Sequence, residues 1–238
     1  MTTAMILCAG FGKRLNELTK DTPKPMLPVE GKPLLEYIIA HLCRLNIKKI
    51  IINIHYLAEK ITSYFGNGRK WNVEITYSCE DTPLGTSGAV KKVEKILSAE
   101  DNFLVLHGDV VCGQDYNELV KFQASRKNAA GTIILHRRTG SNSIVELDDA
   151  NRIIKFQERP KNPAEEETWV NSSIYCFNKE IFNYIPAGTS DFPEDIFPGV
   201  IKDGKLYGYP LSAYRCSVDS RDRYEKLKND IKNGRINN

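Results

Sequence analysis

Short apolar runs rich in β-branched residues alternate with segments of helical periodicity through the first half of the chain. Residues 49–54 read KIIINI, a run typical of a strand buried on both faces. After Pro33, leucine and isoleucine recur at the spacing that makes one face of a helix apolar. Parallel strands need a long crossover between them, usually a helix, so this alternation predicts a parallel sheet flanked by helices.

The same patterns set the expected order of elements along the chain. Residues 143–147 and 152–156 flank a polar loop of hairpin length, which predicts an antiparallel hairpin. Ser220 is expected to cap a last helix, with Gly234 ending it. The expected strands are residues 4–9, 49–54, 73–77, 103–107, 132–136, 143–147, 152–156, 169–177 and 205–211, and the expected helices are residues 34–42, 58–65, 87–97, 116–126, 179–185, 193–202 and 221–233. The pattern therefore predicts an α/β fold with a doubly wound, mostly parallel central sheet and a small antiparallel hairpin region in the second half.

Composition excludes several classes of protein. The 238 residues include 33 Lys and Arg and 30 Asp and Glu, which are interspersed and give a net charge of +3. A dedicated nucleic-acid binder typically carries a larger or clustered positive charge. The longest apolar stretches are far shorter than the roughly 18 residues that span a bilayer, and the N-terminus lacks the basic region of a secretory signal. The cysteines form no C-x-x-C pair and the histidines no H-E-x-x-H motif, so zinc chemistry has no support. We expect a cytoplasmic protein with neither nucleic acid nor membrane as partner.

The first expected strand runs directly into the sequence AGFGKRL at residues 9–15. Its two glycines let backbone N–H groups approach an anion, and Lys13 and Arg14 add positive charge. A plain structural turn would explain the glycines but not the adjacent cations. A dinucleotide fingerprint would need a third glycine at Leu15 and an acid after the second strand, and no G-x-x-x-x-G-K-[ST] motif is present. The loop therefore indicates phosphate binding outside the Rossmann oxidoreductases and the P-loop kinases.

Ten residues beyond Arg14, two prolines frame Lys24 in the sequence TPKPM. Proline restricts the backbone on both sides of the lysine and orients it, although a lysine between prolines is also a common surface feature.

With G-x-G-x-R-L followed by P-K-P, the chain resembles the sugar-1-phosphate nucleotidyltransferases. Within that family it looks most like the mannose- and heptose-1-phosphate guanylyltransferases. Residues 80–89, EDTPLGTSGA, are similar to the family's loop for base and sugar, in which Ser87 can cap the following helix. The strand at 103–107 ends in Gly108-Asp109, similar to the family's metal-binding G-D. A carboxylate at the carboxyl end of a central strand faces the ligand crevice.

The resemblance continues with departures in the second half. Residues 156–160, FQERP, are similar to the family's F-x-E-K-P, with Arg159 in place of the phosphate-binding lysine. Arginine binds phosphate through a bidentate fork rather than as a point charge, so the role can survive with altered geometry. Ser173 occupies the glycine position of the family's N-A-G-I-Y. Asp219 is retained from D-x-G-T, but Arg221 and Asp222 replace the glycine and threonine.

The resemblance implies a single domain over residues 1–238, with a nucleotide-binding half at 1–140 and a sugar-phosphate-binding half at 141–238. By position in the motifs, Arg14, Lys24 and Asp109 are catalytic; Ala9, Gly10, Gly12, Lys13, Glu80, Gly85 and Thr86 bind nucleotide; Gly88, Glu158, Arg159 and Asn171 bind the sugar phosphate; and Asp109 and Asp219 hold Mg²⁺.

The implied reaction transfers a nucleoside monophosphate from an NTP to a sugar 1-phosphate and releases pyrophosphate, with GTP and mannose- or heptose-1-phosphate as the preferred pair. Three alternatives stay open: thymidylyl, uridylyl or cytidylyl transfer to another sugar, cytidylyl transfer to a polyol or choline phosphate, and a non-catalytic regulatory protein that binds NDP-sugar. The sequence does not fix the oligomeric state, and a homodimer is left open.

Overall fold

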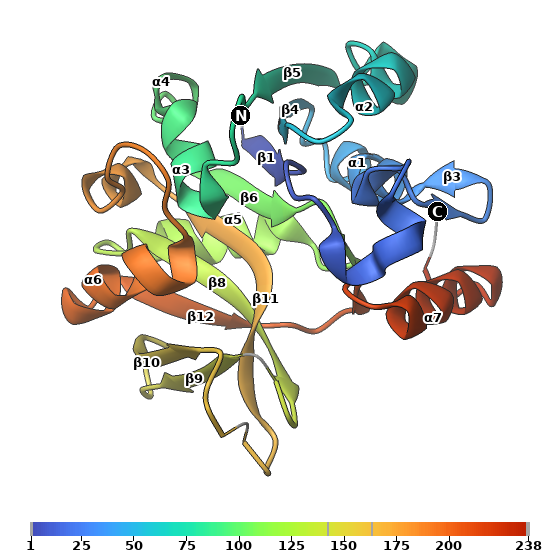
Figure 1. The fold of residues 1–238 in the computed structure, drawn as a ribbon. Coiled ribbons are helices and arrows are strands. Elements are labelled where there is room, and N and C mark those ends of the chain that lie inside the picture. Colours follow the sequence, from blue (N-terminus) through green and yellow to red (C-terminus); the bar gives the residue numbers. More distant parts are fainter. Residues whose placement is uncertain (1, 142, 163, 237–238) are drawn as a thin grey trace. The chain divides into compact units, whose positions relative to one another are not determined.

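The chain forms two units, each built from discontinuous segments (Figure 1). The computed structural model describes residues 2–141, 143–162 and 164–236, apart from the side chains at positions 13 and 16. Unit 1 comprises Met1–Pro83, Leu106–Asp115 and Ser212–Asn238, and unit 2 comprises Leu84–Val105 and Tyr116–Leu211. The strand β6 (Phe103–His107) runs from unit 2 into unit 1.

A parallel sheet organises unit 1. Its strands β1 (Thr3–Leu7), β4 (Lys49–Ile54) and β5 (Glu74–Cys79) lie side by side with β4 between the other two (Figure 1). The isoleucines of β4 are buried, as their continuous run predicted. The crossovers hold helices α1 (Leu34–Arg44) and α2 (Ala58–Phe65), with the short helix η3 (Arg69–Trp71) before β5.

Segments from both ends of the chain complete unit 1. The helices η1 (Lys13–Thr19) and η2 (Lys24–Met26) precede a small hairpin of β2 (Pro28–Val29) and β3 (Lys32–Pro33). The strand β7 (Val110–Cys112) pairs antiparallel with β13 (Arg215–Ser217). Helix α7 (Arg221–Lys232) starts at Ser220, whose side chain accepts a hydrogen bond from the backbone N–H of Arg223. The predicted cap and the left-handed Gly234 after the helix are both confirmed.

Unit 2 is mostly antiparallel. Its longest strand β11 (Thr168–Phe177) pairs antiparallel with β8 (Gly131–Arg138) and touches β9 (Ser143–Leu147), which forms the predicted hairpin with β10 (Ile153–Glu158). The strand β12 (Leu206–Pro210) runs parallel to β8. The helices of this unit are α3 (Gly85–Lys92), α4 (Glu94–Leu97), α5 (Tyr116–Ser125), η4 (Lys179–Asn183), η5 (Phe192–Ile196) and α6 (Phe197–Lys202).

A cluster of aromatic rings forms part of the core of unit 2. Phe177 contacts Tyr175 and Phe192, with ring centroids 5.5 and 4.8 Å away, and the latter two rings lie 5.6 Å from each other. Gly131 is required here, because a Cβ would come within 2.4 Å of the Phe177 ring. Such offset ring pairs contribute about 0.5–1.5 kcal/mol each beyond their buried area.

The predicted α/β fold class is confirmed, and four details of it are corrected. Residues 132–136 do not extend a parallel series, because β8 is antiparallel to β11 and parallel only to β12. The helix expected at 87–97 is divided at Val93, and the helix expected at 193–202 opens with a π-helical turn at η5. Ser87 is not a cap, because α3 begins two residues earlier. Within the described residues, no helix has the length and hydrophobicity needed to span a bilayer.

Candidate functional site

The segment after β1 has the backbone geometry that its glycines predict. Gly12 has a φ of 67° and its carbonyl accepts hydrogen bonds from the Leu15 N–H and the Thr19 hydroxyl. A Cβ built on Gly10 would meet no described atom within 4 Å, so this part of the loop is open to a ligand. Arg14 is exposed in η1, and the side chain of Lys13 lies outside the described part of the structure. Ala9 is buried at the start of the loop.

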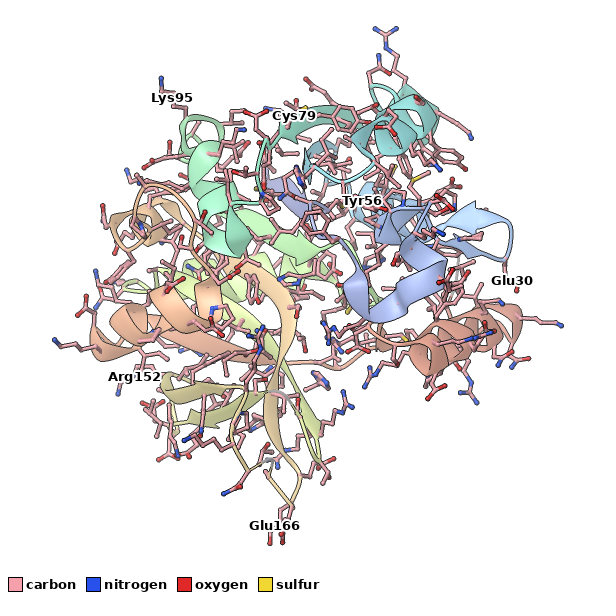
Figure 2. All side chains as sticks on the ribbon, viewed as in Figure 1. Glu30, Tyr56, Cys79, Lys95, Arg152 and Glu166 are labelled. Atoms are coloured by element: carbon pink, nitrogen blue, oxygen red, sulfur yellow. The ribbon has the colours of Figure 1, made fainter. Side chains whose placement is uncertain are left out.

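Aromatic side chains pack against this loop. The Phe11 ring lies edge-on to His55 at 5.3 Å and 5.7 Å from Tyr56, which Figure 2 labels. The Tyr56 hydroxyl donates to the Lys20 carbonyl, so the end of η1 is tied to the residue two positions after β4. The segment that follows β4 therefore contacts the loop at Phe11 and the chain just after η1 at Lys20.

A buried polar network, which the sequence reasoning missed, joins the loop to Glu80. Asn53 on β4 accepts a hydrogen bond from the Cys8 backbone N–H through Oδ1, at 2.7 Å. Its Nδ2 donates to Glu80 Oε1, also at 2.7 Å. Asn53 could have been recognised in the sequence, because it is an amide inside a run of isoleucines. A polar side chain buried in such a strand needs hydrogen-bond partners.

Lys24 and Asp109, which lie 85 positions apart in sequence, form an ion pair. Lys24 Nζ donates to Asp109 Oδ2, and their side chains are 14% and 21% exposed. Burial alone would raise the pKa of Asp109, but the charge of Lys24, aided by His107 and Arg215, outweighs it and lowers that pKa. The pair therefore holds an ionised carboxylate at the end of β6.

The pairing of β7 with β13 brings Asp219 close to Asp109. Ser217 is the register partner of Val110, and the Val218 N–H donates to the Asp109 carbonyl at 2.8 Å, so Asp219 follows directly on a residue bonded to Asp109. Asp219 also pairs with Arg223 at 3.4 Å. Gly108 is required because a Cβ there would approach Cys8 Sγ to 2.5 Å. The two predicted metal ligands are thus held by one short ladder.

Arg215 on β13 is a second cation of this region that the sequence reasoning missed. Burial lowers its pKa, and the charges of Cys112 and Asp109 partly offset that effect. Its positive charge helps to lower the pKa of Asp109. Arg215 is brought to this region by the pairing of β13 with β7, and no sequence motif predicts that pairing.

In unit 2, the predicted residues Gly85, Thr86 and Gly88 contact the segment at 188–192. A Cβ on Gly85 would lie 2.3 Å from the Ser190 carbonyl oxygen, and one on Gly88 would lie 2.4 Å from the Gly188 carbonyl oxygen. The Thr86 hydroxyl donates to Asp191 and accepts from the Phe192 N–H. Close packing inside unit 2 therefore accounts for both glycines. The nucleotide role of Gly85 and Thr86 and the sugar-phosphate role of Gly88 stay predictions.

Glu158 and Arg159 lie at the end of β10. Burial raises the pKa of Glu158, with Glu194 and Asp191 adding to the effect and Arg159 opposing it. Arg159 has a φ of 47° and a side chain 77% exposed, with Nη1 3.3 Å from Glu194 Oε1. An exposed pair of this kind contributes little to stability, so the guanidinium can move to an anionic ligand at small cost.

Asn171 stabilises a bulge in β11. Asn171 pairs with Leu135 and Tyr175 with Ile133, so three residues of β11 lie opposite one residue of β8. Asn171 accepts from the Ser173 N–H at 2.8 Å and donates to the Tyr175 hydroxyl at 3.0 Å. Ser173 has a φ of 62°, the left-handed conformation that explains a glycine at this position in the motif it resembles.

Each unit thus brings together a different part of the predicted site. Unit 1 holds the glycine loop (residues 9–15), Lys24, Glu80, Asp109 and Asp219. Unit 2 holds Gly85, Thr86, Gly88, Glu158, Arg159 and Asn171. Among the described residues, no group of three or more His, Cys, Asp or Glu could hold a metal ion. Two carboxylates do fit Mg²⁺, which is usually bound by one or two acids together with substrate phosphates.

Comparison with known proteins identifies the family. The nucleotidyl transferase family model matches residues 3–214, and the chain belongs to this family.

Curated relatives carry several activities. A UTP–glucose-1-phosphate uridylyltransferase of Synechocystis sp. is 35% identical over 84% of this chain and 55% of its own length. A mannose-1-phosphate guanylyltransferase of Mycobacterium tuberculosis is 30% identical over 97% of this chain and 65% of its own. A D-glycero-alpha-D-manno-heptose 1-phosphate guanylyltransferase of Aneurinibacillus thermoaerophilus is 31% identical over 96% of this chain and 97% of its own. The chain therefore spans just over half of the first relative and nearly all of the third.

Solved structures share the fold. The crystal structure of HddC from Yersinia pseudotuberculosis superposes with a TM-score of 0.83 at 24% identity, over 97% of this chain and all of that one. A structure titled as a putative glucose-1-phosphate thymidylyltransferase from Bacillus anthracis gives a TM-score of 0.85 at 22% identity, over all of this chain and 97% of that one.

Proposed function

We propose that this protein transfers a nucleoside monophosphate from an NTP to a sugar 1-phosphate, forming an NDP-sugar and releasing pyrophosphate. The observation that carries the proposal is the cluster in unit 1: Lys24 bonded to Asp109, with Asp219 adjacent through the β7–β13 ladder. A cation beside two carboxylates is suited to an α-phosphate and its counterion, and this chemistry supports the proposal.

The reaction requires that the reacting phosphates be positioned and their charge neutralised, and it requires no general base. A phosphate monoester has a second pKa of about 6, so the attacking sugar phosphate is already largely dianionic near neutral pH. Its oxygen attacks the α-phosphorus of the NTP, and the bond to the pyrophosphate leaving group breaks. We assign Arg14 and the loop N–H groups to the leaving phosphates and Lys24 to the α-phosphate region.

Asp109 and Asp219 would hold Mg²⁺ in this scheme. The lowered pKa of Asp109 keeps it ionised and ready to ligate a cation. When bound, the ion supplies charge neutralisation at the phosphates.

For the base we propose guanine. Its Watson–Crick edge carries two adjacent donors, N1–H and the N2 amine, which a carboxylate can accept together, whereas uracil and thymine flank their single N3–H with two carbonyl oxygens. The carboxylate of Glu80, whose Oε1 is held by Asn53, suits the guanine pattern. Two relatives that match at least 96% of this chain are guanylyltransferases, one for mannose-1-phosphate and one for a heptose 1-phosphate, and we propose these sugars as acceptors.

A second candidate is UTP with glucose-1-phosphate, favoured by the 35% identity to the Synechocystis uridylyltransferase. Both are tested by pyrophosphate release with Mg²⁺ across GTP, dTTP, UTP, CTP and ATP, each against mannose-, glucose- and heptose-1-phosphate. We expect release with GTP and mannose- or heptose-1-phosphate. Release only with UTP and glucose-1-phosphate would select the second candidate, and no release in any combination would overturn nucleotidyl transfer to these sugars.

A further inference from the structure

Asn53 lies at the end of the central strand of unit 1, between two segments proposed to bind one nucleotide. Its register partners are Leu7 on β1 and Ser78 on β5, the strands that lead into the glycine loop and to Glu80. It is 2% exposed in an otherwise isoleucine-rich strand. An amide at such a site costs free energy unless both of its ends are hydrogen-bonded.

Both ends are bonded, and the partners fix which way the amide faces. The Cys8 N–H can only donate, so it requires the carbonyl oxygen of Asn53, at 2.7 Å. The NH₂ group then faces Glu80 Oε1, also at 2.7 Å. One side chain thus connects the first residue after β1 to the carboxylate after β5.

A second bridge leaves the same end of β4. His55 Nδ1 donates to the Glu80 carbonyl at 2.8 Å, and its ring contacts the Phe11 ring of the glycine loop at 5.3 Å. The Glu80 N–H also bonds to the Ile54 carbonyl at 2.9 Å. The distance between the loop and the Glu80 carboxylate is therefore set by residues of the β4 end.

We infer that Asn53 is a positioning residue for the nucleoside triphosphate: it fixes the Glu80 carboxylate, which reads the base, relative to the loop that binds the phosphates. The inference rests on the proposed function. Serine at this position is too short to reach both partners. Aspartate keeps the acceptor for Cys8 but replaces the donor to Glu80 with a second negative charge, and two adjacent carboxylates repel each other.

The test compares Asn53→Ser and Asn53→Asp with Ser78→Ala. Ser78 is the register partner of Asn53, is also buried, and its hydroxyl has no hydrogen-bond partner among the described residues, so its removal is a matched control. In N53S we expect the KM for GTP to rise about tenfold, the size typical of losing a group that orients a ligand-binding residue. The KM for the sugar phosphate and kcat should stay near wild type, because no hydrogen bond joins Asn53 to Lys24 or Asp109 among the described residues. N53D should have the larger effect and weaken the preference for GTP over other triphosphates, and S78A should match wild type.

Thermal unfolding by circular dichroism separates these effects from loss of the fold. The double variant N53D/E80Q exchanges the donor and the acceptor, so it should recover the melting temperature lost in N53D without recovering the GTP preference. A folded N53S with an unchanged KM for GTP, or one in which all kinetic parameters fall together, would overturn the inference. If wild type turns over no triphosphate, the proposed function itself is wrong, and the inference falls with it.

Discussion

The two units differ in how they hold their candidate site residues. In unit 1 the residues bond directly to one another: Lys24 to Asp109, and Glu80 to Asn53. In unit 2 the departures from the family's pattern lie on strained backbone, since Arg159 and Ser173 both have positive φ values. Left-handed backbone costs a non-glycine residue about 1–2 kcal/mol. Unit 1 also departs from that pattern, at Arg221 and Asp222, but these residues lie in the first turn of helix α7 and not on left-handed backbone. The difference is therefore that the departures in unit 2 carry backbone strain and those in unit 1 do not.

The largest effect is expected in unit 1. Replacing Asp109 by asparagine removes the charge that faces Lys24, and kcat for pyrophosphate release should fall by at least about 10²–10³-fold, as when one electrostatic contact to a transition state is lost. The control is Asp148→Asn in the β9–β10 turn, whose carboxylate pairs with the exposed Arg152 (Figure 2). D148N should be fully active, and a D109N variant with near-normal turnover would refute the assigned role.

The next largest effects are expected from glycine substitutions, which should lower stability in unit 2 but not in unit 1. Gly85→Ala puts a Cβ 2.3 Å from the Ser190 carbonyl at a φ of 73°, so we expect a loss of about 2 kcal/mol in the free energy of unfolding. Gly10→Ala meets no described atom within 4 Å and should leave stability unchanged while raising the KM for the NTP. Urea unfolding and steady-state kinetics on both variants check this contrast, and equal stability of the two would contradict it.

A smaller effect, of opposite sign, is expected at Ser173. Ser173→Gly relieves the left-handed backbone while the N–H bond to Asn171 is kept, so the protein should gain about 0.5 kcal/mol after the added chain entropy of glycine. The midpoint of urea unfolding measures it. Destabilisation in S173G would show that the Ser173 side chain contributes more to the bulge than its backbone costs.

The smallest effects are changes of stability with pH. The contributions of Asp109 in unit 1 and Glu158 in unit 2 are expected to change with pH in opposite directions. The pKa of Asp109 is lowered from 3.8, so its ionised form stabilises unit 1 above that pH, and this contribution is lost as pH falls through the lowered pKa. The pKa of Glu158 is raised from 4.5, so the folded state binds its proton more tightly, and stability is lost as pH rises through the raised pKa. Glu158→Gln should therefore melt higher than wild type at pH 8 and equally below pH 4.5. A melting curve with no pH-dependent difference between the two proteins would exclude this role for Glu158.

The sequence by itself determined the features that depend on neighbouring residues. The isoleucine run of β4, the β9–β10 hairpin, the Ser220 cap and the fold class all follow from local periodicity and turn chemistry. The motif positions also named Lys24 and Asp109 as candidate catalytic residues, although they did not predict the bond between them.

The tertiary structure decided what depends on register and close approach between distant segments. The β7–β13 ladder, formed by two three-residue strands about 100 positions apart, brings Asp219 and Arg215 towards Asp109, and strands so short leave no periodic signal. Likewise the need for glycine at positions 85 and 88 comes from the backbone carbonyl groups of Ser190 and Gly188, which lie far away in the sequence. Contacts across such separations arise only when the chain has folded, because side-chain approach is set by packing rather than by sequence spacing.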